Sequence, residues 1–316
     1  MKRVLTAVVL IPVVLLLVFR APLWLFALAV AGIIIVALHE YLNIAEAAGI
    51  KPFRRLTYIS ALIPIIWALT NIAIINSQSR QYRAFPEAGL WHGLMLIPFL
   101  LPVLVGIPLV FQSDLREGLS SASSSALGVL YVGVSLSLLI GLRADVVQRV
   151  LVILVLFSVW AGDIAAYYIG RSFGRHKLAP IVSPNKSWEG AIASILASVV
   201  VSILVLRYAP DLNRWFAGKW GFHFGPVTFY PPLAGPVESP LVLLHAVLLG
   251  TIMNVAAQFG DLFESALKRG AGLKDSGSLL PGHGGMLDRI DALLFAIPVV
   301  WYYAQLTGFL LPAFQK

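Results

Sequence analysis

The chain lacks cysteine entirely and is poor in charge. With no cysteine among 316 residues, disulfide bonds and thiolate metal sites are excluded. Charged residues make up 12% of the chain, whereas a soluble domain carries roughly 25%. The formal net charge of +8 comes without an aromatic-interleaved basic patch or a nucleic-acid motif, so nucleic acid is not an expected partner. Lys and Arg held at an anionic membrane surface explain the same excess.

What the chain has instead is long uncharged apolar runs. Hydrophobic residues make up 59% of it, and five runs exceed the about 20 residues that a helix needs to cross a hydrocarbon core. These runs are Leu56–Ser79, Ala88–Ser113, Gly118–Leu142, Ser239–Gly260 and Ala292–Gln315. Because a bilayer tolerates no unpaired backbone groups, each run must be helical. The sequence therefore predicts an all-α polytopic membrane protein.

Shorter apolar blocks bring the expected number of spans to about nine. We predict membrane helices at residues 4–19, 22–44, 56–76, 90–111, 119–141, 147–170, 189–207, 240–262 and 291–312. With the N-terminus in the cytoplasm, 14 of the 23 Lys and Arg residues face that side, as the positive-inside tendency favours. Residues 1–145 are predicted to form N-terminal membrane helices, and residues 146–316 a catalytic region with cytoplasmic loops at 170–189 and 261–291.

The loop at 261–291 is dense in polar groups and glycine. Glycine allows close approach of the backbone to a ligand and positive φ, which suits the binding of phosphate oxygens. Asp288 and Asp291 lie three residues apart at the start of the last span, so a helix presents both on one face. They could cap that helix, or bind a hard cation such as Mg²⁺. Asp261, Ser265 and Lys268 share a face if the preceding helix continues.

Asp163 lies deep inside an apolar run, where an ionisable group is costly and marks a functional site. A structural ion pair with an Arg on a neighbouring helix is the competing interpretation. In the first loop, Ser187 can cap the following helix, whose backbone N–H groups attract phosphate. Lys186 would add a point charge for a polyphosphate. His176 and His283 could be acid–base groups, although hydrogen-bond donation to phosphate is the favoured interpretation for both.

These residues resemble the signature of phosphatidate cytidylyltransferases. The resemblance is carried by Ser265, Lys268-Arg269, Lys274-Asp275, Pro281-Gly282-His283-Gly284-Gly285 and Asp288-Arg289-x-Asp291. It extends to Asp163, Tyr167, Gly170-Arg171, Gly174, His176-Lys177 and the stretch from Ser183 to Gly190, where Ser187 stands in place of a frequent Thr and Asn185 at a variable position. The clear resemblance covers roughly residues 160–300.

The resemblance implies transfer of CMP from CTP to phosphatidic acid, which gives CDP-diacylglycerol and pyrophosphate. Two anions must meet, so charge neutralisation and positioning should dominate the catalysis. We expect Mg²⁺ as cofactor, with K⁺ as a candidate second cation, bound by the metal ligands Asp163, Asp261, Asp288 and Asp291. The expected catalytic residues are Asp261, Asp288, Lys268, Lys274 and Asp275. The expected substrate-binding residues are Lys186, Ser187, Ser265, Arg269, Gly282, His283, Gly284, Gly285 and Arg289.

Two other functions are compatible with the residues alone. A CTP-dependent kinase acting on a polyprenol or similar lipid would release CDP rather than pyrophosphate. An ion-coupled transporter would use Asp163 as its coupling carboxylate, although the two Gly- and Lys-rich loops argue against it. The expected partners are CTP, phosphatidic acid and membrane lipids, and the sequence leaves a homodimer open. The expected location is the inner membrane of a bacterium, with the site facing the cytoplasm.

Overall fold

The computed structural model describes residues 12–77, 106–144, 149–220, 240–279 and 284–310. Most of these residues are helical, which confirms the all-α expectation. The helices are α2 (Leu23–Ala47), α3 (Arg54–Ser77), α5 (Leu115–Gly128), the π-helix η2 (Val129–Val134), α6 (Ser135–Ala144), α7 (Arg149–Phe173), α8 (Trp188–Trp220), α9 (Pro240–Gly270) and α10 (Leu287–Leu310).

Five helical stretches are long and apolar enough to cross a membrane: Leu23–Ala47, Leu115–Ala144, Arg149–Phe173, Trp188–Tyr208 and Val242–Gly270. Each coincides with a predicted span. The predicted spans at 56–76 and 291–312 fall on the helices α3 and α10, which are not among these five. Half of the predicted span at 4–19 and most of the predicted span at 90–111 lie outside the described residues.

The chain forms two compact units. The first comprises residues 1–141 and 267–290, and the second comprises residues 142–266 and 291–316. The signature residues from 261 to 291 are thus divided between the two units, because residues 267–290 belong to the unit that contains the N-terminal helices. The predicted division at residue 145 concerns catalytic role, and it stays a prediction.

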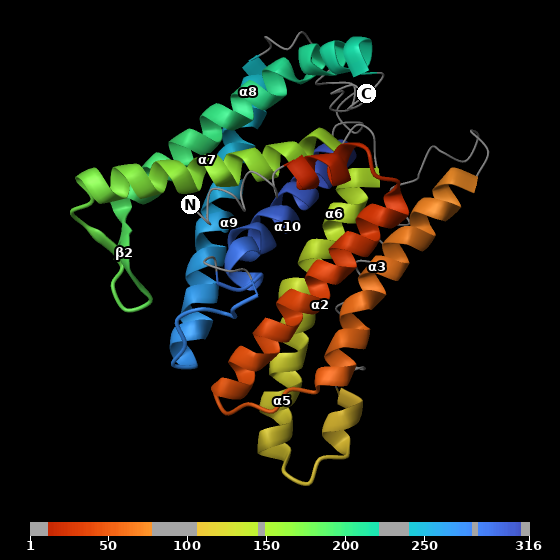
Figure 1. Ribbon diagram of the computed structural model, residues 1–316, viewed down its shortest axis with the longest axis vertical. Coiled ribbons are helices and arrows are strands. Elements are labelled where there is room, and N and C mark those ends of the chain that lie inside the picture. Colours follow the sequence, from red (N-terminus) through yellow and green to blue (C-terminus); the bar gives the residue numbers. More distant parts are fainter. Residues whose placement is uncertain (1–11, 78–105, 145–148, 221–239, 280–283, 311–316) are drawn as a thin grey trace. The chain divides into compact units, whose positions relative to one another are not determined.

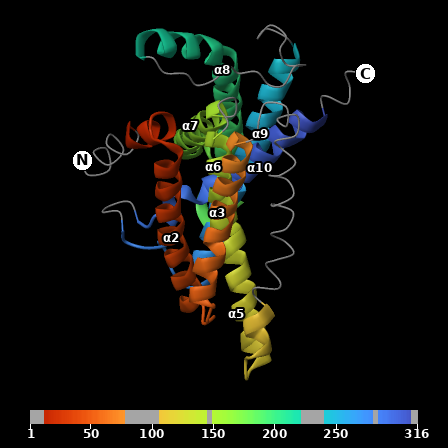
Figure 2. The ribbon, with the colours of Figure 1, turned by 90° about the vertical axis from the view of Figure 1, so that its right-hand side faces the viewer.

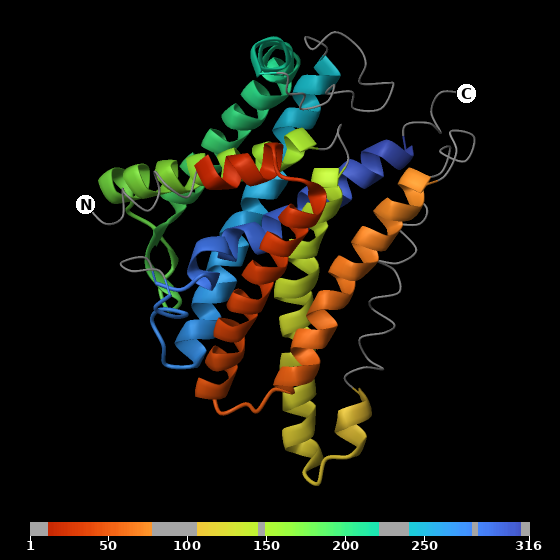
Figure 3. The ribbon, with the colours of Figure 1, turned by 45° about the vertical axis from the view of Figure 1, so that its right-hand side comes forward.

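In the first unit, α2, α3 and the continuous stretch α5–η2 pack side by side (Figures 1 and 3). Gly133 in η2 faces the backbone of Ala61 on α3 so closely that an added Cβ would lie 2.9 Å from the Ala61 Cα. Asp114 caps α5, since its carboxylate accepts hydrogen bonds from the backbone N–H groups of Arg116 and Glu117. Lys51 forms an ion pair of 2.8 Å with Glu117. This pair joins the loop between α2 and α3 to the first turn of α5.

In the second unit, α7 and α8 pack closely against each other. Glycines permit this approach, because a Cβ on Gly190 would lie 3.3 Å from the Gly170 Cα. The last turns of α8 run at an angle to the rest of that helix (Figure 2). The loop between α7 and α8 contains two short antiparallel strands, β1 (Lys177–Ala179) and β2 (Ser183–Ser187). The sequence analysis predicted a loop here and not a hairpin.

Buried polar side chains connect the helices of the second unit. The amide of Asn254 on α9 donates hydrogen bonds to the hydroxyls of Ser194 and Ser198 on α8, at 3.0 and 2.7 Å. Ser198 donates in turn to the carbonyl oxygen of Ser158 on α7, at 2.7 Å. All four residues are at most 2% exposed. Hydrogen bonds of this kind join helices in an apolar environment, where the hydrophobic effect contributes little to their association.

Candidate active site

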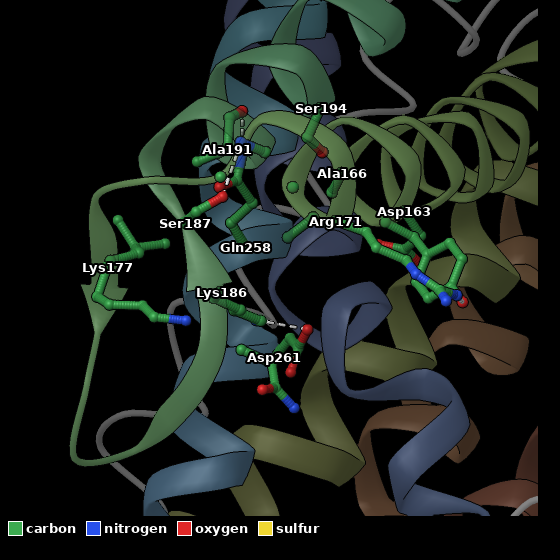
Figure 4. Close-up of a pocket in the computed structure, with 17 residues that line it drawn as sticks. Asp163, Ala166, Arg171, Lys177, Lys186, Ser187, Ala191, Ser194, Gln258 and Asp261 are labelled. Carbon is green, nitrogen blue, oxygen red and sulfur yellow. Dashed lines mark hydrogen bonds and ion pairs between the residues drawn. The ribbon is translucent and has the colours of Figure 1, made fainter.

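A polar cavity of about 720 Å³ lies within the second unit (Figure 4). It is lined by the C-terminal half of α7, the β1–β2 hairpin, the first turns of α8 and the middle of α9. The charged residues in its wall are Asp163, Arg171, Lys177, Lys186 and Asp261. Three cationic groups and two carboxylates thus face one space, which suits a highly anionic ligand accompanied by a cation.

The hairpin places Lys186 at the cavity. Its ammonium group lies 2.5 Å from the carboxylate of Asp261 on α9, and the two side chains are 26% and 35% exposed. Figure 4 shows Lys186 extending from β2 toward Asp261. Because both groups remain partly accessible, water or an incoming phosphate can reach either partner.

Ser187 and its neighbours explain why the hairpin ends at this point. The Ser187 hydroxyl accepts a hydrogen bond of 3.2 Å from the backbone N–H of Gly190, so it caps α8 as the sequence predicts. A side chain at Gly174 would collide with the carbonyl oxygen of Gly170 and with Ser187. His176 lies 2.7 Å from Glu189 in the first turn of α8. These contacts fix the hairpin against the N-terminus of α8.

Neutral polar side chains that connect the helices also line the cavity. Gln258 donates hydrogen bonds to the carbonyl oxygen of Ala191, at 3.1 Å, and to the side chain of Asn254, at 2.6 Å. Ser194 also lines the cavity. The cavity is therefore lined by neutral polar side chains as well as by charged ones.

Further carboxyl groups of the second unit interact with those of the cavity. Asp291 lies at the start of α10 and is half-buried. It is close enough to Asp261, Glu264 and Asp163 for the like charges of these carboxylates to repel one another. Ser265 donates a long hydrogen bond of 3.5 Å to Asp261. Within the described ranges, no group of three His, Asp or Glu residues is arranged to hold a metal ion by itself.

The first unit contains a second charged cluster. Lys268 forms an ion pair of 2.5 Å with Asp288, and these side chains are only 11% and 7% exposed. The Asp288 carboxylate also accepts hydrogen bonds from the backbone N–H groups of Ser276, at 3.1 and 3.2 Å, and Gly285, at 2.8 Å. Asp288 therefore holds together the two ends of the segment that joins α9 to α10.

Steric restriction also requires glycine in this segment, in addition to the phosphate binding inferred from the sequence. Gly284 has a φ of 78°, a backbone conformation that residues with a side chain rarely adopt. A Cβ at this position would lie 2.5 Å from the Asp288 carboxylate. Gly285 is buried and has no room for a side chain. Gly282 and His283 lie outside the described residues.

The remaining predicted residues lie on exposed positions near this cluster. The Arg269 guanidinium donates to the carbonyl oxygen of Leu273, at 3.1 Å. Lys274, Asp275 and Arg289 are exposed. The structure thus gathers Asp163, Lys186, Ser187 and Asp261 around one cavity, whereas Lys268 and Asp288 belong to the cluster of the first unit.

Glu40 is a buried acid that the sequence analysis did not single out. Glu40 on α2 is 5% exposed, and its carboxylate accepts hydrogen bonds from the segment at 276–287. Glu40 follows the end of the apolar run at 21–38, so the signal that singled out Asp163, an ionisable residue inside such a run, did not point to it.

Comparison with known proteins identifies the relatives of this chain. Residues 1–307 match the model of the cytidylyltransferase family. The phosphatidate cytidylyltransferase of Staphylococcus haemolyticus is 31% identical over 302 residues, which cover 94% of this chain and 96% of that protein. That of Haemophilus influenzae is 29% identical over 312 residues, covering 96% and 97%. That of Brucella suis is 40% identical over 184 residues, or 57% of each chain.

The family match thus spans nearly the whole chain, including the N-terminal helices, for which the sequence analysis found no specific resemblance. Together with the cavity and the signature residues, it shows that this chain belongs to the cytidylyltransferase family.

Proposed function

We propose that this chain transfers the cytidylyl group of CTP to phosphatidic acid, producing CDP-diacylglycerol and pyrophosphate. The observation that carries the proposal is the cavity of the second unit, where Lys186 and Asp261 form an ion pair beside Asp163, Arg171 and Lys177. Its location among membrane-type helices suits a lipid substrate, and its charged groups suit a nucleoside triphosphate.

The reaction needs no nucleophile from the protein. An oxygen of the lipid phosphate attacks the α-phosphorus of CTP, a new P–O bond forms, and the bond to the β-phosphate oxygen breaks, so that pyrophosphate leaves. Both reactants are anions, and their repulsion is the main obstacle to their meeting. Fixed cationic groups that neutralise this charge, and that hold the two phosphates in line, therefore supply most of the rate increase.

The cationic side chains of the cavity supply this neutralisation. Lys186 exchanges its contact with Asp261 for a phosphate oxygen when the triphosphate binds. Arg171, whose guanidinium donates a 3.0 Å hydrogen bond to the Tyr167 hydroxyl, presents a planar donor suited to phosphate. Lys177 extends from β1 into the same space.

The carboxylates of the cavity fit a divalent cation. Mg²⁺ prefers oxygen ligands and is usually bound by one or two carboxylates together with substrate phosphates and water, and Asp163 and Asp261 both line the cavity. We therefore propose these two as its protein ligands. When bound, the cation would withdraw charge from the phosphate oxygens. Cation-binding roles for Asp288 and Asp291, and a second cation such as K⁺, stay predictions.

We further propose nine membrane helices, with the hairpin and the 261–291 segment on the cytoplasmic side of a bacterial inner membrane. The positive-inside count supports this orientation. The proposed triphosphate contacts of Ser265, Lys268, Arg269, Lys274, Asp275 and Arg289 rest on the resemblance. A homodimer is not required to form the cavity, because one chain lines it.

Purified protein incubated with CTP labelled in the cytosine ring, Mg²⁺ and phosphatidic acid tests the proposal. Labelled cytidine should enter the lipid fraction in equal amount to the pyrophosphate released, and omission of phosphatidic acid should stop both. Release of CDP with transfer of phosphate to an added polyprenol would instead identify a lipid kinase. Protein that catalyses neither reaction, while remaining monodisperse in detergent, would contradict the proposal.

A further inference from the structure

Glu40 is an acidic residue in an apolar setting. It lies on α2 in the first unit and is 5% exposed, next to the buried Leu38 and Tyr41. Burial of a carboxylate is unfavourable unless hydrogen bonds replace its hydration. The hydrogen-bond donors that replace the water around Glu40 come from Ser276, Met286 and Leu287, far along the chain.

Both oxygens of the Glu40 carboxylate accept hydrogen bonds from the segment at 276–287. Oε1 accepts from the backbone N–H of Met286, at 2.9 Å. Oε2 accepts from the backbone N–H of Leu287, at 2.7 Å, and from the hydroxyl of Ser276, at 2.9 Å. Leu287 is the first residue of α10. Glu40 therefore satisfies donors at the N-terminus of α10 and also holds Ser276, six residues after the end of α9.

The backbone around Glu40 leaves no space for other side chains. A Cβ on Gly277 would lie 2.7 Å from Oε1 of Glu40. A Cβ on Gly285 would collide with both Glu40 and Ser276. The glycines at these two positions let the segment close around the carboxylate.

Ser276 connects Glu40 to Asp288. Its hydroxyl donates to Glu40 and accepts a 3.3 Å hydrogen bond from the backbone N–H of Asp288. Its own backbone N–H donates to the Asp288 carboxylate, which also pairs with Lys268. A displacement of Glu40 would therefore release Ser276, and with it one of the donors that orient Asp288.

We propose that Glu40 is a positioning residue for the reaction: it fixes Ser276, Met286 and Leu287 and, through Ser276, the orientation of the Asp288 carboxylate. An amide cannot replace it, because glutamine has one acceptor oxygen and in either orientation would turn its NH₂ group toward a backbone N–H, that of Met286 or that of Leu287. The activity part of the proposal rests on the proposed function, whereas the placement of the segment does not.

The test compares Glu40→Gln with Glu46→Gln, the same change at an exposed position of the same helix. The kcat and KM for CTP are measured per monodisperse protein in detergent. Glu40→Gln should lower kcat about tenfold or more, since a small displacement of reacting groups has effects of this size. Glu46→Gln should leave kcat unchanged. Ser276→Ala, which removes one donor, should give an intermediate loss.

A spectroscopic readout separates positioning from a general loss of folding. The chain has no cysteine, so Leu279→Cys, at an exposed position of the segment, takes a single nitroxide spin label. The spectrum should show a mobile label in the Glu40→Gln background and an immobile one in the Glu46→Gln background.

Equal kcat values in the two glutamine variants would overturn the proposal, as would a loss of kcat without a change in label mobility. If Glu40→Gln yields no monodisperse protein, kcat and the mobility of the label at position 279 are measured in Ser276→Ala instead, and an unchanged value of either would overturn the proposal. If the unsubstituted protein transfers no cytidylyl group, the proposed function fails, and the label spectra still decide whether Glu40 fixes the segment.

Discussion

The ion pair between Lys186 and Asp261 joins the hairpin to α9 at the wall of the cavity. Its two side chains are about one quarter and one third exposed, so solvent weakens the attraction between them. The pair therefore contributes little to stability. Its proposed role is to keep Lys186 available for a phosphate oxygen and Asp261 available for a cation.

Asp261→Asn should lower kcat/KM about a hundredfold or more, the range seen when one group that stabilises transition-state charge is lost. The protein should remain folded, because water can hydrate the partly exposed Lys186. The radiolabel assay and thermal unfolding in detergent measure the two effects. Asp211→Asn removes a carboxylate from an exposed pair with Arg214 and serves as the control; equal losses in both variants would contradict the assigned role of Asp261.

Asp288 differs from Asp261 because its ion pair is buried. Asp288→Asn should abolish turnover and also destabilise the protein by about 3–5 kcal/mol, since it leaves the Lys268 ammonium buried without its counter-charge. Glu117→Gln breaks the exposed pair with Lys51 and should cost less than about 1 kcal/mol. Thermal unfolding of the two variants checks the difference, and similar unfolding temperatures would contradict it.

Sequence reasoning found Asp163 and missed Glu40 for a physical reason. Asp163 interrupts the middle of an apolar run, where a charge is conspicuous. Glu40 lies near the end of the predicted span at 22–44, where an acid facing water is ordinary. Its partners come from residues 236 to 247 positions later, and no local pattern reveals a contact at such separation.

Helices were predicted more reliably than the segments between them. Apolar length alone indicates α2, α7 and α9, because unpaired backbone is excluded from lipid. The hairpin was not predicted, since the residues of β1 and β2 show no alternation of apolar and polar side chains. The glycines of the signature were assigned to phosphate binding, whereas Gly277 and Gly285 are also required by the space that Glu40 occupies.

The packing of α7, α8 and α9 gives a prediction about stability. Asn254→Ala removes the donor to Ser194 and Ser198 and the acceptor of Gln258. It should lower stability by about 0.6 to 1.7 kcal/mol, the size measured for hydrogen bonds between membrane helices. Val255→Ala, at an exposed position of the same helix, is the control for thermal unfolding. An unchanged unfolding temperature for Asn254→Ala would show that the polar contacts do not hold these helices together.

For the whole molecule, the proposed orientation can be tested by labelling single cysteines in a chain that has none. Ser278→Cys should react with a membrane-impermeant maleimide only in inside-out vesicles, because the positive-inside count assigns residues 261–291 to the cytoplasm. Lys219→Cys should react only in right-side-out vesicles. Both sites are exposed. Reaction of both cysteines from the same side would overturn the nine-helix arrangement.

The contact between Glu40 and Ser276 bears on how the protein is made. Ser276 follows Glu40 by 236 residues, so α2 is synthesised and inserted long before the donors that satisfy its carboxylate exist. Until the last part of the chain leaves the ribosome, the newly inserted α2 carries an acid with none of its final hydrogen bonds. Truncation before residue 276 would leave the nascent protein permanently in that state, and such fragments should be preferred targets of membrane quality-control proteases.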